Sequence, residues 1–113
     1  MPTGWHIPTY AELQTLSTAV NNNGNSLKAI GQGDAMWGGA GTNTSGFSAL
    51  LAGYRILSGD YPNLGYITGF WSSTEYNPAT YAYYVSLYST DSNINFYGSW
   101  KGSGLSVRCA KDF

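Results

Sequence analysis

The most regular pattern of apolar positions lies near the start of the chain. Leu13, Leu16 and Val20 follow one another at intervals of three and four residues, which is the spacing of one face of an α-helix. Residues 21–24 then read Asn-Asn-Asn-Gly, and these residue types tolerate the left-handed backbone conformation that ends many helices. The pattern predicts a helix from residue 10 to about residue 20.

The residues just before this helix carry a start signal. Thr9 and Glu12 stand three positions apart, as in a capping box. In that motif the Thr9 hydroxyl accepts a hydrogen bond from the amide of Glu12, and the Glu12 carboxylate accepts one from the amide of Thr9. Glu12 is therefore assigned a structural role.

Two less regular segments follow the helix. Residues 27–30 predict a short second helical turn. Residues 31–48 are rich in Gly, Thr, Asn and Ser and predict a long irregular segment, anchored by Trp37. Loops of that length are usually functional or disordered.

The clearest β-pattern spans residues 81–88, where side chains alternate between the two faces of a strand. One face carries Tyr81, Tyr83, Val85 and Leu87, and the other carries Ala82, Tyr84, Ser86 and Tyr88. After a predicted turn at residues 91–92, Ile94 and Phe96 share one face, while Asn93, Asn95 and Tyr97 share the other.

Three further segments predict strands, at residues 51–56, 70–73 and 105–109, the last of them after a turn at residues 101–104. One helix followed by short strands favours an α+β fold whose C-terminal third is an antiparallel meander. The 113 residues predict a single domain over residues 1–113.

The amino-acid composition argues against several classes of binding partner. Only 10% of the residues are charged and the net charge is −1, whereas an average protein has about 25% charged residues. This argues against a nucleic-acid partner, which would require a basic stripe. No apolar run approaches the roughly 20 residues that span a membrane, so no membrane insertion is expected. With 15 Gly, 10 Tyr and 4 Trp, the surface is built from aromatic rings and neutral polar groups.

If the apolar strand faces point inward, an aromatic and polar face points outward and forms the candidate binding surface. Its expected ligand-binding residues are Tyr84, Ser86, Tyr88, Asn93, Asn95, Tyr97, Trp100 and Lys101. Exposed rings beside hydroxyls and amides suit sugars, and they suit protein partners equally well. The alternative is that several of these rings cover a second layer of core.

Residues for catalysis or metal binding do not cluster in the sequence. His6 is the only histidine, and its neighbours Trp5 and Ile7 indicate a structural, partly buried ring. Cys109 is the only cysteine, so neither a disulfide within the chain nor a multi-cysteine zinc site can form. The carboxylates are scattered along the chain. We therefore expect no catalytic residues, no metal and no cofactor.

Four segments of the chain resemble the Fibrobacter succinogenes major paralogous domain. They are GWHIPTYAE at residues 4–12, SGFSAL with GYR at residues 45–50 and 53–55, FWSSTEY at residues 70–76, and SVRCAKD at residues 106–112. Order and spacing agree over nearly the whole chain, although Leu13 stands where the family usually has Trp.

The resemblance implies a C-type-lectin-like fold related to the branch of the formylglycine-generating enzymes. That fold has one main N-terminal helix, a short second helix, a twisted antiparallel sheet and long Gly/Ser/Asn-rich loops. The family usually carries further strands, and often a cysteine, before the GWH segment. Met1 stands there instead, so we expect the domain to lack those strands and Cys109 to lack its disulfide partner.

The resemblance also limits the chemistry. The enzyme branch uses a pair of cysteines, so one cysteine argues against formylglycine generation. Calcium-dependent lectins of this fold use Glu-Pro-Asn or Gln-Pro-Asp together with Trp-Asn-Asp, and this chain has none of these motifs. Any ligand binding is therefore expected to be independent of metal.

Members of the family are mostly bacterial surface or secreted proteins. The chain is accordingly expected to be a non-catalytic extracellular or cell-surface module that binds a glycan or a protein receptor, although its first residues contain no signal peptide. Two alternatives stay open. One is a receptor-binding protein of a phage or bacterium, diversified by a retroelement. The other is a structural subunit of a surface filament or virion, which would self-associate through an incomplete sheet edge.

Overall fold

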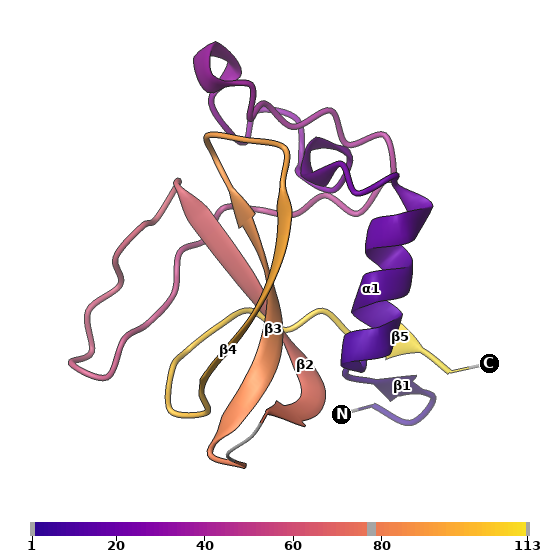
Figure 1. Cartoon of the computed structure of the whole chain (residues 1–113), viewed down its shortest axis with the longest axis vertical. Helices are drawn as coiled ribbons and strands as arrows, with labels where there is room; N and C mark the ends of the chain where they lie inside the picture. The colour runs from indigo at the N-terminus through magenta and orange to yellow at the C-terminus, as the bar shows by residue number, and fades with distance from the viewer. Residues whose placement is uncertain (1, 77–78, 113) are drawn as a thin grey trace.

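A computed structural model describes residues 2–76 and 79–112 (Figure 1). This part of the chain forms a small α+β domain with one α-helix and two antiparallel sheets. The elements in chain order are β1 (Trp5–His6), α1 (Tyr10–Ala19), the 3-10 helices η1 (Gly24–Ser26) and η2 (Ala35–Trp37), β2 (Ile67–Tyr76), β3 (Tyr81–Tyr88), β4 (Ile94–Trp100) and β5 (Ala110–Lys111).

Helix α1 begins and ends where the sequence predicts. The capping box is formed, because the amide of Glu12 donates to Thr9 Oγ1 at 3.2 Å and the amide of Thr9 donates to Glu12 Oε1 at 3.0 Å. Val20 is the C-cap residue. The start of the helix is also tied to the sheet, since the amide of Tyr10 donates to Thr74 Oγ1 at 2.9 Å.

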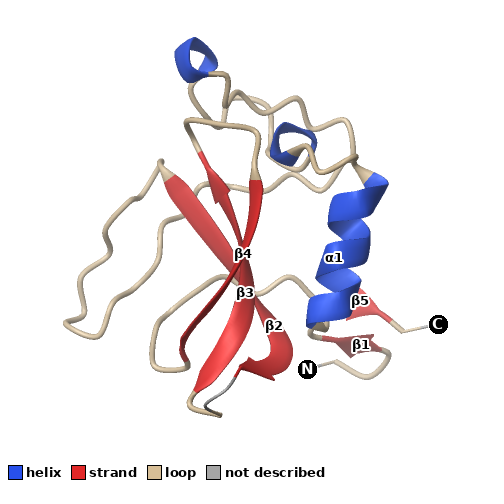
Figure 2. Cartoon of the chain, in the orientation of Figure 1, coloured by secondary structure: helices blue, strands red, loops and turns tan. Residues whose placement is uncertain are grey.

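Strands β2, β3 and β4 form a three-stranded antiparallel meander with β3 in the centre (Figure 2). Val85 of β3 pairs with Phe70 on one side and with Phe96 on the other. Side chains of directly paired residues lie on the same face of a sheet. The predicted alternation of residues 81–88 is therefore confirmed. Strand β2 extends beyond the predicted residues 70–73 at both ends, whereas β4 begins one residue after Asn93 and continues to Trp100.

Helix α1 covers the apolar face of this sheet and closes the core. The ring of Tyr10 lies 4.1 Å from that of Tyr83 and 5.5 Å from that of Phe96. Leu13 is buried in one cluster with residues of β2 and β3, among them Val85 and Leu87. The side of the sheet that faces α1 is accordingly the inner face, and the opposite side is available for other contacts.

The two ends of the chain meet in the second sheet. Strand β1 pairs with β5, with Trp5 opposite Lys111 and His6 opposite Ala110 (Figure 1). The predicted last strand at residues 105–109 is wrong, because the residues before Ala110 make only isolated bridges. Gly104 meets Arg55, and Ser106 meets Phe70. A strand needs one continuous neighbour, and this segment passes from one neighbour to another.

The predicted strand at residues 51–56 is also wrong. Gly53 bridges to Thr68 and Arg55 bridges to Gly104, so adjacent bridges go to different partners. Gly53 has φ +71°, which interrupts an extended backbone. The segment is a loop that meets β2 at Gly53 and then turns to Gly104.

The second helix differs from the prediction as well. The 3-10 turn η1 lies at Gly24–Ser26, before the expected residues 27–30, and a further 3-10 turn forms at Ala35–Trp37. Trp37 does not anchor its loop, because 66% of the residue is exposed.

Lys28 holds these loops together instead. It is 0% exposed, and its Nζ donates to the carbonyl oxygens of Gly39 and Asp91 at 2.8 Å each and to Asn25 Oδ1 at 3.1 Å. Burial lowers the pKa of Lys28, and the nearby Asp91 opposes that shift. A buried ammonium surrounded by oxygen atoms thus joins three separate segments of the chain.

Candidate functional site

Five of the eight residues predicted for binding lie together on the outer face of the sheet, away from α1. Tyr84 pairs with Tyr97, and Ser86 pairs with Asn95, so these four side chains share that face. Tyr88 lies two positions beyond Ser86 on β3 and therefore shares it too. Strand pairing brings together residues up to 13 positions apart along the chain.

Three of these residues line a pocket of about 220 Å³ in the outer face, which we call the tyrosine pocket. Its walls come from β2, β3, β4 and two loops. The lining residues are Tyr54, Ile67, Thr68, Gly69, Tyr84, Ser86, Tyr88, Ser99, Ser103 and Leu105. The only ionisable side chains among them are tyrosines, so the pocket presents neutral hydroxyls and aromatic rings.

The tyrosines of this face are coupled to one another. A hydrogen bond with Tyr97, together with partial burial, raises the pKa of Tyr88 to about 12. Burial raises the pKa of Tyr84 as well, with smaller contributions from Tyr97 and Tyr54. The rings of Tyr84 and Tyr97 lie 5.9 Å apart. The Tyr84 and Tyr88 phenols are therefore held neutral at physiological pH and can donate and accept hydrogen bonds.

Tyr54 completes the pocket from a loop that precedes the sheet. Asn63 Nδ2 donates to its phenol oxygen at 3.1 Å, which fixes the position of the ring. Neither Tyr54 nor the loop residues Ser103 and Leu105 is identified by the sequence patterns, because no local periodicity shows which loop folds over a sheet. Tyr54 lies in the GYR segment of residues 53–55, but that resemblance assigns it no place in a binding site.

Ser86 departs from the expectation that it points to solvent. It is 1% exposed, and its hydroxyl donates to the carbonyl oxygen of Thr68 at 3.1 Å. The reason is that the outer face is partly covered by the segments that carry Tyr54 and Leu105. Of the rings on this face, Tyr84 and Tyr88 are half-buried, whereas Tyr97 is exposed.

Trp100, Lys101 and Asn93 lie apart from the tyrosine pocket. Trp100 pairs with Tyr81, whose side chain shares the inner face, and the two rings lie 5.3 Å apart. Lys101 Nζ forms an ion pair with Glu75 Oε1 at 2.8 Å. The amide of Asn93 donates to Asp91 Oδ1 in the turn before β4. The structure therefore does not place these three with the other five predicted residues.

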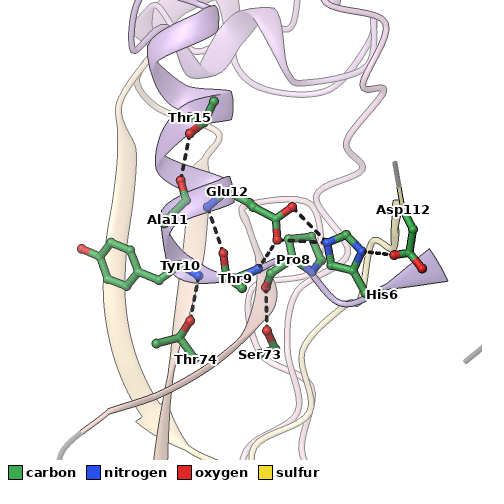
Figure 3. Close-up of polar contacts among 10 residues, drawn as sticks. All are labelled: His6, Pro8, Thr9, Tyr10, Ala11, Glu12, Thr15, Ser73, Thr74 and Asp112. Atoms are coloured by element: carbon green, nitrogen blue, oxygen red, sulfur yellow. Dashed lines mark hydrogen bonds and ion pairs between the residues drawn. The ribbon is translucent and has the colours of Figure 1, made fainter. Parts of the chain in front are cut away.

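His6 forms the most prominent charged cluster of the described residues (Figure 3). Its Nδ1 lies 2.6 Å from Asp112 Oδ1, and its Nε2 lies 2.9 Å from both carboxylate oxygens of Glu12. Hydrogen bonds with Glu12 and Asp112 raise the pKa of His6 above its ordinary value of 6.5. The hydrogen bond from the backbone of Thr9, followed by that from His6, lowers the pKa of Glu12.

The contacts of His6 connect separate parts of the chain. Both ring nitrogens face carboxylates of this chain. The imidazolium between these two carboxylates links β1, the start of α1 and the end of the chain. The sequence does not reveal the contact with Asp112, because it depends on the pairing of β1 with β5.

Within residues 2–76 and 79–112, no group of three or more His, Cys, Asp and Glu side chains is arranged to hold a metal ion. In the same part of the chain, no helix has the length and apolar character needed to cross a membrane.

The family model of the Fibrobacter succinogenes major domain matches residues 1–111 of the chain. The chain belongs to this family. No curated protein and no solved structure matches it.

In this member of the Fibrobacter succinogenes major domain family, the segments that carry the resemblance have identifiable structural roles. The GWH segment forms β1 and leads into the capping box of α1. Residues 70–76 form most of β2, and residues 106–112 contain β5. The family motifs thus account for the contacts that join the chain ends, the helix and the sheet.

Proposed function

We propose that this domain is a non-catalytic recognition module that binds a neutral glycan in the tyrosine pocket. The observation that carries the proposal is the pocket itself, whose walls combine rings with hydroxyls and carry no charged side chain. Sugar rings present C–H faces that pack on aromatic rings and hydroxyls that exchange hydrogen bonds with phenols and serines. Tyr84 and Tyr88 supply both kinds of contact.

The dimensions of the pocket favour a small part of a larger ligand. Its volume of about 220 Å³ lies below the range of about 300–1,000 Å³ typical of pockets that enclose a whole drug-sized ligand. A single terminal sugar residue of a glycan fits that description. Tyr97, exposed beside the pocket, can contact the next residue of the same chain.

We also propose that the fold is of the C-type-lectin-like class and that the protein acts outside the cell or at its surface. The support for the fold is the helix packed on a three-stranded meander, the pairing of the chain ends, and the long loops between α1 and β2. The support for the location is the low content of charged residues and the resemblance described above.

The test is binding to a glycan array, with the wild-type protein compared with Tyr84→Ala and Trp100→Ala. The two residues are aromatic and lie on opposite faces of the sheet, so Trp100→Ala is the matched control. We expect selective binding that falls at least tenfold in Tyr84→Ala and persists in Trp100→Ala and in a calcium chelator. Equal binding by the two variants would contradict the assigned site.

Two other results would redirect the proposal. If the protein binds no glycan on the array, a glycan ligand is contradicted and a protein receptor is favoured. That result would also favour the hypothesis of a receptor-binding protein diversified by a retroelement. A calcium requirement would contradict binding independent of metal. Circular dichroism of Tyr84→Ala must match the wild type, so that loss of binding is separated from loss of fold.

A separate observation supports a second candidate function, self-assembly. Strand β4 is an outer strand of the three-stranded sheet and pairs with β3 alone among the named strands. Its seven residues present a backbone edge that a second chain can extend. Light scattering tests this. A mass that rises with concentration supports assembly, and a stable monomer at high concentration contradicts it.

A further inference from the structure

A second cavity, of about 550 Å³, lies between α1, β2 and the segment that leads into β5. It shares no lining residue with the tyrosine pocket. Its volume falls within the range of about 300–1,000 Å³ that is typical of sites for small molecules. We call it the helix cavity.

The walls of the helix cavity are mostly apolar. Leu13 and Leu16 contribute from α1, Phe70 and Trp71 contribute from β2, and Phe47 contributes from the loop before β2. Leu13 and Phe70 belong to the buried core, so the cavity reaches the centre of the domain. The rings of Phe47 and Phe70 pack edge to face at 5.6 Å, which gives the cavity a firm aromatic wall.

Arg108 provides a positive charge beside this wall. Its guanidinium lies 4.3 Å from the centre of the Phe47 ring, and its Nη1 donates to the carbonyl oxygen of Phe47 at 2.7 Å. These two contacts hold the group in place. No carboxylate within ion-pair distance of Arg108 is found among residues 2–76 and 79–112. Of its five N–H groups, only one is used in that part of the chain.

The acidic residue at the cavity does not cancel this charge. Glu12 lines the cavity, but its carboxylate accepts hydrogen bonds from His6 Nε2 and from the amide of Thr9. The raised pKa of His6 favours the imidazolium form, and this positive charge is shared between Glu12 and Asp112. Arg108 therefore remains the cation available to a ligand.

We propose that the helix cavity binds an amphipathic carboxylate, whose apolar chain or ring lies against the leucines and phenylalanines and whose carboxylate meets Arg108. Arginine and carboxylate form paired, charge-assisted hydrogen bonds, which explains why an acid is preferred over a neutral molecule of the same shape. This site is separate from the proposed glycan site and does not depend on it.

The experiment compares octanoate with octanamide by calorimetry, because the two probes have the same chain and differ in charge. We expect octanoate to bind the wild-type protein at least tenfold more tightly. Arg108→Gln should abolish that difference while leaving the weaker octanamide affinity unchanged. Lys111→Gln, which removes an exposed cation outside the cavity lining, is the matched control and should behave as the wild type.

A second pair of variants tests the place of binding. Thr15→Trp, at the exposed rim of the cavity, and Leu16→Trp, inside it, should each block both probes. Thr15→Trp keeps the test valid if Leu16→Trp does not fold. Equal affinity for the two probes, no binding of either, or binding that persists in Thr15→Trp would each overturn the proposal. Tyr84→Ala should leave octanoate binding unchanged, which separates this test from that of the glycan site.

Discussion

His6 Nδ1 and Asp112 Oδ1 lie 2.6 Å apart although the two residues are separated by 106 positions in the chain. The same imidazole contacts Glu12 at the start of α1 through its other nitrogen (Figure 3). One side chain therefore joins the first strand, the helix and the end of the chain. Its protonation state determines how strongly these three parts are held together.

This cluster predicts a stability maximum at mildly acidic pH. The pKa of His6 is raised in the folded protein, so its contribution is complete below 6.5 and is lost as the pH rises through the raised value. The pKa of Glu12 is lowered, so its contribution is complete above 4.5 and is lost as the pH falls through the lowered value. Both contributions are complete between these limits.

Urea unfolding at about pH 5.5 and about pH 8.5 measures the effect, because the first value lies below the ordinary histidine pKa and the second lies well above it. We expect the wild-type protein to lose stability between them and His6→Gln to lose much less. The variant keeps a polar side chain, and His6 is the only histidine. Equal losses in the two proteins would show that another group is responsible.

Lys28→Met should destabilise the domain markedly. The methionine has a similar shape, but it leaves the carbonyl oxygens of Gly39 and Asp91 without their ammonium donor. Each unsatisfied buried polar group costs about 1–3 kcal/mol, so for two such groups we expect the free energy of unfolding to fall by about 2–6 kcal/mol. Urea unfolding measures this, with the exposed Lys111→Met as control. A change no larger than in the control would argue against the bridging role.

The Tyr88 phenol should ionise well above the usual range of tyrosine. Its pKa of about 12 depends first on its hydrogen bond with Tyr97, so Tyr97→Phe should lower that pKa toward the ordinary value of 10. Carbon NMR of labelled tyrosine at about pH 10.5, just above the usual tyrosine pKa, distinguishes the two proteins. Tyr61→Phe, which alters an exposed ring outside the pocket, serves as the control. A Tyr88 signal unchanged by Tyr97→Phe would contradict the coupling.

Gly98→Ala should weaken the sheet through one neighbouring ring. A Cβ atom at this position would lie 2.9–3.1 Å from ring atoms of Tyr76, which also packs edge to face against Tyr83. We expect a loss of about 1 kcal/mol, typical of mild overpacking. In a Tyr76→Ala background, Gly98→Ala should lower the free energy of unfolding only slightly, because the ring that it would clash with is absent. A loss as large as in the wild-type background would mean that the strain lies elsewhere.

The sequence alone determined the features that depend on near neighbours in the chain. The capping box of Thr9 and Glu12 places the start of α1, because both partners lie within one helical turn. The alternation of residues 81–88 identifies the two faces of β3, because side chains alternate along any strand. The prediction that Tyr97 and Trp100 belong to one surface was wrong, because β4 continues to Trp100 and the two residues, three positions apart, therefore lie on opposite faces.

The tertiary structure decided whatever depends on partners distant in the chain. Residues 51–56 and 105–109 have the composition of strands, but each segment meets its neighbours only at isolated positions. Five of the predicted binding residues share a face, whereas the loop that brings Tyr54 over them has no periodic signal. The burial of Lys28 and the contact of His6 with Asp112 likewise arise from packing. The local sequence pattern indicates which backbone conformation a segment prefers and on which face each side chain lies. Only the folded chain determines which segments meet.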